Sequence, residues 1–134
     1  MTKKILIVDD DKDLTKSLSQ ILKTEGYTVV EAYNGSDGLK MMKDENPDLM
    51  ILDVMMESDT AGFEVASAIR NPRDHSKYKE FKNLPIILLT AINQVTNSRF
   101  SLNEDSSFLR EINEFCTKPI DPGDLLNKIE QHIN

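Results

Sequence analysis

The chain has 134 residues, of which 39% are hydrophobic and 29% charged, and its formal net charge is −7. This length and balance suit one folded domain of an ordinary water-soluble protein. Direct nucleic-acid binding is not expected, because it usually needs a basic surface. No membrane segment or secretory signal is expected either, since every apolar stretch is much shorter than the roughly 18 residues that cross a bilayer. The one cysteine, Cys116, lies in an apolar run and fits an inert core thiol of a cytoplasmic protein.

Short apolar runs recur along most of the chain. They cover about residues 4–9, 27–32, 49–53, 84–90 and 115–117. Apolar runs of this length, bounded by turns, predict buried parallel strands. Segments with helical spacing separate the first strands, and strands that alternate with helices predict a parallel sheet with helices on both faces.

The predicted helices begin and end at recognisable signals. The first covers about residues 11–25, with Asp11 as its cap and Asp13 as a favourable charge in its first turn. Asn34 can cap the second, and Asp121 followed by proline begins the last. A helix at about 63–70 completes this set. Apolar side chains at helical spacing should face the core: Leu14, Leu18, Ile21, Leu22, Leu39, Met42, Phe63, Ala66, Ile69, Leu125, Leu126, Ile129 and Ile133.

Two polar segments interrupt this regular pattern. Residues 73–83 mix basic and acidic side chains, and we interpret them as a solvated loop or an extra helical turn, where a phosphate or kinase contact is an open alternative. Residues 91–113 are rich in Asn and Ser and lack a clean apolar stripe before Phe108. We expect a helix in this second segment, short or displaced toward residues 105–112.

Chemically useful side chains stand at the ends of four predicted strands. Asp9 and Asp10 follow the first strand, Asp53 closes the third, Thr90 closes the fourth and Lys118 follows the fifth. Ligands of an open α/β sheet bind outside the carboxyl ends of its strands, so we expect these side chains to converge. Neighbouring carboxylates repel one another unless a cation lies between them, and hard oxygen ligands suit Mg²⁺. The pattern predicts a site that holds Mg²⁺ and carries a phosphoryl group on a carboxylate.

Four segments in this order make the chain resemble the receiver domain of two-component response regulators. They are ILIVDDD at 5–11, PDLMILDVMM at 47–56, PIILLTA at 85–91 and TKP at 117–119. The resemblance extends over essentially all of residues 1–134, which are predicted to form one receiver domain. It implies an α/β fold of the flavodoxin-like, doubly wound type, in which a five-stranded parallel sheet of order 2-1-3-4-5 carries helices on both faces.

The resemblance also implies a role for each site residue. Asp53 would be the phosphoacceptor, and Asp9, Asp10 and Asp53 would hold Mg²⁺ together with the backbone carbonyl of Met55. Thr90 would bond the phosphoryl group and move on activation, and Lys118 would pair with the phosphoryl oxygens. Phe115 occupies the position of an aromatic switch in the family, and the bond from Lys118 to Pro119 is expected to be cis.

The implied function is signalling. A histidine kinase would donate the phosphoryl group, and an unknown downstream protein would respond to the changed conformation. The domain would catalyse only the Mg²⁺-dependent transfer to its own aspartate, so it would not be an enzyme in the ordinary sense. Neither nucleic acid nor membrane is expected as a direct partner.

The chain departs from the family in three places. Glu57 stands where proline is usual, and the loop before Gly62 is one residue longer than the common form. The separation of Thr90 and Lys118 is also several residues greater than usual. The additional residues fall in 91–113, next to the family's output surface, so the surface for the downstream partner is the least transferable feature.

Two other functions are consistent with part of the pattern. A haloacid-dehalogenase-like phosphatase also uses two aspartates at the spacing of Asp9 and Asp11, with Mg²⁺ and a lysine. That interpretation lacks the expected glycine-threonine pair and a cap domain, and it leaves Asp53 unexplained. A pseudo-receiver would bind a partner without phosphorylation. The chain, however, retains all five active-site residues of the family, which are Asp9, Asp10, Asp53, Thr90 and Lys118.

Overall fold

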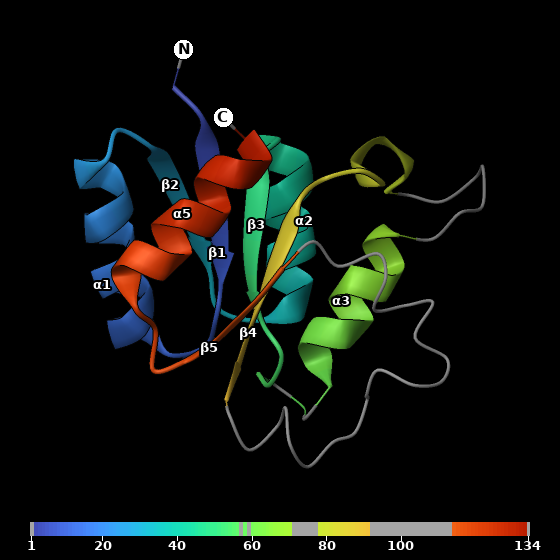
Figure 1. Cartoon of the computed structure of the whole chain (residues 1–134). Helices are drawn as coiled ribbons and strands as arrows, with labels where there is room; N and C mark the ends of the chain where they lie inside the picture. The colour runs from blue at the N-terminus through green and yellow to red at the C-terminus, as the bar shows by residue number, and fades with distance from the viewer. Residues whose placement is uncertain (1, 57, 59, 71–77, 92–113, 134) are drawn as a thin grey trace.

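A computed structural model describes residues 2–56, 58, 60–70, 78–91 and 114–133 of the chain. Five parallel strands form one sheet in the order β2-β1-β3-β4-β5 (Figure 1). The expected doubly wound topology is therefore confirmed. The strands are β1 (Lys4–Val8), β2 (Thr28–Ala32), β3 (Leu49–Asp53), β4 (Ile86–Ala91) and β5 (Glu114–Lys118).

Helices cover both faces of this sheet, as Figure 1 shows. One side carries α1 (Lys12–Thr24) and α5 (Pro122–Ile133), and the other carries α2 (Gly35–Glu45) and α3 (Ala61–Ile69). A single 3-10 turn, η1 (Lys79–Phe81), precedes β4. This turn agrees with the extra helical turn that was one of the two alternatives for residues 73–83.

The core is two apolar layers, one on each face of the sheet. Successive side chains of a strand point to opposite faces, so Leu6 and Val8 enter the layer under α2 and α3, while Ile5 and Ile7 enter the layer under α1 and α5. All five residues of β3 are buried. A strand covered on both faces needs a continuous apolar run, which is why Leu49–Asp53 could be recognised without an alternating pattern.

Most of the expected helix boundaries are confirmed. The Asp11 side chain accepts a hydrogen bond of 3.1 Å from Leu14 N, and Asn34 accepts one of 2.8 Å from Asp37 N. The start expected for α3 was wrong by two residues, because the helix begins at Ala61 rather than Phe63. Thr60, a residue type that often caps helices, precedes α3, but its side chain accepts no capping hydrogen bond.

Several expectations fall on parts of the chain that the structure does not describe. The helix expected near residues 105–112 lies outside the described residues, and so do Glu57 and residues 73–77 of the polar segment. Within the described ranges, no helix is both long and apolar enough to span a membrane. Cys116 is buried, as expected for a core thiol.

Candidate functional site

The register of the sheet brings the predicted site residues to one edge. Val8 pairs with Leu52, so Asp9 follows β1 at the level where Asp53 ends β3. Asp53 pairs with Leu89, one residue before Thr90. Ala91 pairs with Lys118 across β4 and β5. The carboxyl ends of four strands thus place carboxylates, a hydroxyl group and an amine at the same edge of the sheet, as the sequence predicted.

Three carboxylates form a compact cluster at this edge. Asp9, Asp10 and Asp53 each offer an oxygen, and these three oxygens lie within 4.8 Å of one another. Asp9 is fully buried and Asp53 is 4% exposed, while Asp10 is exposed to solvent. The cluster therefore has a buried side that belongs to the sheet and an open side at which a ligand could enter.

Lys118 provides the positive charge at the cluster. Its Nζ lies 3.2 Å from Asp9 Oδ2 and 3.3 Å from Asp53 Oδ1. The side chain of Lys118 is 27% exposed, so its ammonium group is partly open to solvent. One ammonium group between two buried carboxylates leaves an excess of negative charge, and Asp10 adds to it.

This excess charge perturbs the protonation of the site. Burial and then the nearby charge of Asp9 raise the pKa of Asp53, Lys118 partly opposes both effects, and the resulting pKa is about 6. Burial by itself would lower the pKa of Lys118, but the attraction of Asp9 and Asp53 outweighs burial and raises it. Lys118 is therefore held in its charged form, and the ionised form of Asp53 gains from any additional cation.

The orientation of Asp9 leaves one oxygen available. Its Oδ1 accepts a hydrogen bond of 3.0 Å from the backbone amide of Asp11. Its Oδ2 is buried, and no hydrogen bond of good geometry reaches it from the described residues, although Lys118 Nζ is close. Buried polar atoms are normally satisfied, so this oxygen has capacity for a further ligand. An all-oxygen donor set with such an atom fits Mg²⁺.

The two proposed switch residues have different surroundings. Thr90 is fully buried at the end of β4, and its Oγ1 donates to the carbonyl of Ala91 at 3.2 Å. Phe115 is half-buried and packs against the core layer under α2 and α3. Its backbone carbonyl accepts a hydrogen bond of 2.8 Å from Lys128 Nζ on α5. The switch roles that the resemblance implied for Thr90 and Phe115 remain predictions.

The segment after Asp53 packs very closely against α3. The amide of Gly62 donates to the carbonyl of Val54 at 2.8 Å. A Cβ atom at position 62 would lie 2.7 Å from Val54 Cα and would overlap the carbonyl oxygen of Asp53. Met55 follows in this segment, and its side chain is 42% exposed. Only glycine allows α3 to approach the backbone of the acidic residue, a role that the sequence analysis missed.

The peptide bond between Lys118 and Pro119 is cis. This agrees with what the resemblance implied. The turn lies directly after β5, so it belongs to the same edge as the acidic cluster.

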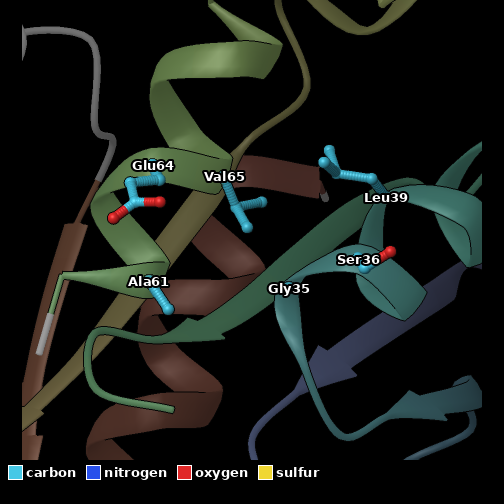
Figure 2. A pocket seen from close by; sticks show the side chains of 6 residues that line it. All are labelled: Gly35, Ser36, Leu39, Ala61, Glu64 and Val65. Carbon is cyan, nitrogen blue, oxygen red and sulfur yellow. The ribbon is translucent and has the colours of Figure 1, made fainter. Parts of the chain in front are cut away.

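A separate cavity lies away from the acids. It has a volume of about 160 Å³ and opens between the first turns of α2 and α3 (Figure 2). Its lining consists of Gly35, Ser36, Leu39, Ala61, Glu64 and Val65. None of the clustered aspartates lines it, so this cavity is distinct from the candidate site.

Comparison with known proteins identifies the family. The model of the response regulator receiver domain matches residues 5–130. The chain belongs to this family. A receiver domain is a signalling module of two-component systems, so the family match favours the signalling interpretation over the phosphatase.

Individual relatives agree with this assignment. Over 127 residues the chain is 36% identical to the CAI-1 autoinducer sensor kinase/phosphatase CqsS of Vibrio cholerae, and the match covers 95% of this chain and 17% of that protein. The chain therefore spans about a sixth of that relative's length.

Solved structures show the same fold. A CheY-like receiver domain protein of Methanospirillum hungatei is 30% identical with a TM-score of 0.75, and the match covers 99% of this chain and 94% of that one. The chemotaxis response regulator CheY4 of Vibrio cholerae is 27% identical with a TM-score of 0.77, and the match covers 98% of each chain. Both matches extend over nearly the whole receiver domain.

Proposed function

We propose that Asp53 accepts a phosphoryl group from the phosphohistidine of a histidine kinase. The observation that carries this proposal is the setting of Asp53, a buried carboxylate in contact with Lys118 and beside two further acids. A buried acid at the end of an apolar strand is costly unless it has a function or a partner. Here the partners are those that a phosphoryl group needs.

The transfer requires only the carboxylate of this chain as nucleophile. An oxygen of ionised Asp53 attacks phosphorus, and an acyl-phosphate P–O bond forms. The P–N bond to the donor imidazole breaks at the same time, and its electron pair stays on the ring nitrogen. The phosphoryl group then carries its negative charge into the site.

Lys118 and Thr90 are suited to receive that charge. The Lys118 ammonium group already lies 3.3 Å from Asp53 Oδ1, so it can pair with a phosphoryl oxygen without a large movement. Thr90 ends the neighbouring strand and offers a hydroxyl at the same edge. Fixed positive charge and hydrogen bonds that stabilise the equatorial oxygens account for most of the catalysis in phosphoryl transfer.

The acidic cluster has the composition of a Mg²⁺ site. Asp9, Asp10 and Asp53 would hold the ion, with the backbone carbonyl of Met55 as a further ligand. A bound Mg²⁺ would neutralise charge shared by the carboxylates and the phosphoryl oxygens. The buried Oδ2 of Asp9 and the raised pKa of Asp53 support this proposal, because both indicate a site with too little positive charge.

Phosphorylation would then be read as a change of shape. We propose that Thr90 turns toward the phosphoryl group and that Phe115 repacks, so that a downstream protein binds one of two conformations. A phosphoryl group need favour one conformation by only a few kcal/mol to shift the population. We also propose that residues 1–134 form one receiver domain that works in the cytoplasm without direct contact to nucleic acid.

The test is phosphorylation in vitro with Mg²⁺ and a small phosphodonor such as acetyl phosphate. Intact-mass spectrometry should find one acid-labile phosphoryl group on the parent protein. Asp53→Asn should remove it while leaving the fold unchanged, because the two side chains have the same shape. Asp44→Asn, at an exposed position of α2, is the matched control and should be phosphorylated like the parent.

The other functions give different results in the same experiment. Continuous release of phosphate without a stable adduct would indicate a phosphatase. No phosphorylation by either the small donor or a kinase would indicate a pseudo-receiver. A phosphoryl group on the Asp53→Asn variant would show that the acceptor has been assigned wrongly.

A further inference from the structure

One buried hydroxyl connects the start of α1 to residues 9–11, which carry two of the clustered acids. Thr15 is fully buried. Its Oγ1 lies 2.9 Å from the carbonyl oxygen of Asp11 and 3.4 Å from that of Asp9. Both carbonyls precede the first residue of α1, so the hydroxyl reaches out of the helix toward the site.

The same segment determines how the Asp9 carboxylate points. The Asp11 amide donates to Asp9 Oδ1 at 3.0 Å, which leaves Oδ2 on the side of Lys118. That amide belongs to the peptide group between Asp10 and Asp11. Thr15 contacts the Asp9 carbonyl, which belongs to the peptide group before this one, and the Asp11 carbonyl, which belongs to the peptide group after it. A shift of either neighbour would turn the amide away from Oδ1.

We propose that Thr15 is a positioning residue for the metal and phosphoryl site. Its hydroxyl holds residues 9–11 in the conformation that orients the Asp9 carboxylate, and it touches neither metal nor phosphoryl group itself. The proposal rests on the function proposed above for the acidic cluster. It assigns to α1 a part in the chemistry beyond covering the sheet.

The ordinary alternative is a local helix contact. Threonine hydroxyls often bond the carbonyl four residues earlier, with little consequence beyond the helix. Thr24 makes that bond in the last turn of α1, where its Oγ1 lies 2.9 Å from the carbonyl oxygen of Gln20 at an exposed position. Thr15 differs because it is buried and has a second acceptor, Asp9, six residues earlier. The two threonines therefore form a matched pair within one helix.

The first experiment compares Mg²⁺ affinity in folded protein at 25 °C by titration calorimetry, a method that suits a chain without tryptophan. Thr15→Val removes the hydroxyl and keeps the shape. It should weaken Mg²⁺ binding roughly 10-fold, the lower end of the usual effect of residues that support metal ligands. Thr15→Ser keeps the hydroxyl and should bind Mg²⁺ nearly as the parent does. Thr24→Val should leave the affinity unchanged.

The second experiment uses metal-free protein. Hydrogen exchange of the Asp11 amide should accelerate in Thr15→Val and not in Thr24→Val, because only the first variant loosens the bond to Asp9 Oδ1. Thr15→Ala provides a second variant without the hydroxyl in case valine does not fit. Equal affinity and equal exchange in the parent and Thr15→Val would overturn the proposal, and so would a loss in Thr15→Ser as large as in Thr15→Val.

The two experiments also separate this inference from the proposed function. A parent protein that binds no Mg²⁺ contradicts the metal site, whereas exchange at Asp11 still shows whether Thr15 holds the segment. A parent that binds Mg²⁺ normally, together with an unaffected Thr15→Val variant, contradicts only the role of Thr15.

Discussion

Lys118 Nζ lies 3.3 Å from Asp53 Oδ1, yet this contact does not keep Asp53 at the ordinary acidity of an aspartate. Burial and the neighbouring charge of Asp9 outweigh the lysine, and the pKa of Asp53 rises from 3.8 to about 6. Lys118 is shared with Asp9, so it cannot fully neutralise either carboxylate. The raised pKa of Asp53 indicates that unneutralised negative charge destabilises this site and that a bound cation would stabilise it.

Asp53→Asn should therefore stabilise the metal-free protein at pH 7. The raised pKa means that folded Asp53 keeps its proton up to about pH 6, whereas the unfolded chain releases it near pH 3.8. Between these two pH values the folded state binds more protons than the unfolded state, so the contribution of Asp53 to the free energy of unfolding falls as pH rises. Above about pH 6 this contribution no longer changes. The shift of roughly two pKa units corresponds to a gain of at most about 3 kcal/mol for the variant at pH 7.

Urea unfolding in the presence of a chelator measures this gain. The difference between the variant and the parent should shrink as pH falls from 7 toward 4, because folded Asp53 takes up its proton below about pH 6 and is then neutral, like asparagine. Asp44→Asn should show no such pH dependence. A variant that is less stable than the parent at pH 7 would contradict the charge strain.

Mg²⁺ should stabilise the parent protein against unfolding, because it relieves repulsion among the clustered carboxylates. At a concentration 100 times the dissociation constant, mass action gives about 2.7 kcal/mol. Asp10→Ala should lose most of this gain, since Asp10 supplies a carboxylate on the open side of the cluster. Thermal unfolding with and without Mg²⁺ measures the effect, and Asp44→Ala is the control. A melting temperature of the parent that saturating Mg²⁺ does not change would argue against the metal site.

The sequence predicted the sheet and the acidic edge because both depend on simple local signals. The three central strands, β1, β3 and β4, are built on apolar runs, and Asp9, Asp53 and Lys118 stand at or after strand ends that the backbone alone brings together. The missed features depend on contacts across the fold. Thr15 falls one turn before Leu18 on the buried side of α1, a spacing that could have indicated a buried hydroxyl.

The closeness of Gly62 to Asp53 had no comparable local signal. A glycine near a helix start usually indicates a turn, and nothing in the neighbouring residues shows that a strand end lies against it. The start of α3 was predicted two residues too far along the chain, because Ala61 and Gly62 add no large apolar side chain to the helical pattern.

Gly62→Ala should damage both stability and phosphorylation. The added methyl group would overlap the backbone of Asp53, so α3 or the end of β3 must move. We expect a loss of about 1–3 kcal/mol, typical of overpacking, and a slower rate of phosphate incorporation. Gly123→Ala is the matched control, because nothing lies within 4 Å of a Cβ atom there. That variant should be unchanged or more stable by up to about 1 kcal/mol, since alanine favours the helix.

Phosphorylation should change hydrogen exchange most in β4 and β5. Thr90 and Phe115, the two residues expected to switch, lie on these strands, which pair directly with each other. Beryllofluoride, a mimic of the phosphoryl group, should therefore alter exchange there more than in α1 or α2. The comparison uses Asp53→Asn as the control that cannot respond to the mimic. Changes confined to α1 and α2 would contradict a switch built on Thr90 and Phe115.

The phosphorylated state should persist unless a partner removes the phosphoryl group. Its hydrolysis needs a water molecule in line with the bond to Asp53, and we expect Met55, two residues later, to lie near that approach with only an apolar side chain. The sequence also suggested Ile92 as a shield, but this residue lies outside the described part of the chain. Met55→Asn should speed the loss of phosphate about 5-fold, since its amide can orient water with one hydrogen bond of about 1 kcal/mol. Met55→Leu stays apolar and is the control that should retain the parent rate. The measurement is the decay of phosphate on Asp53 after the donor is removed, and equal rates in all three proteins would show that Met55 does not control access of water.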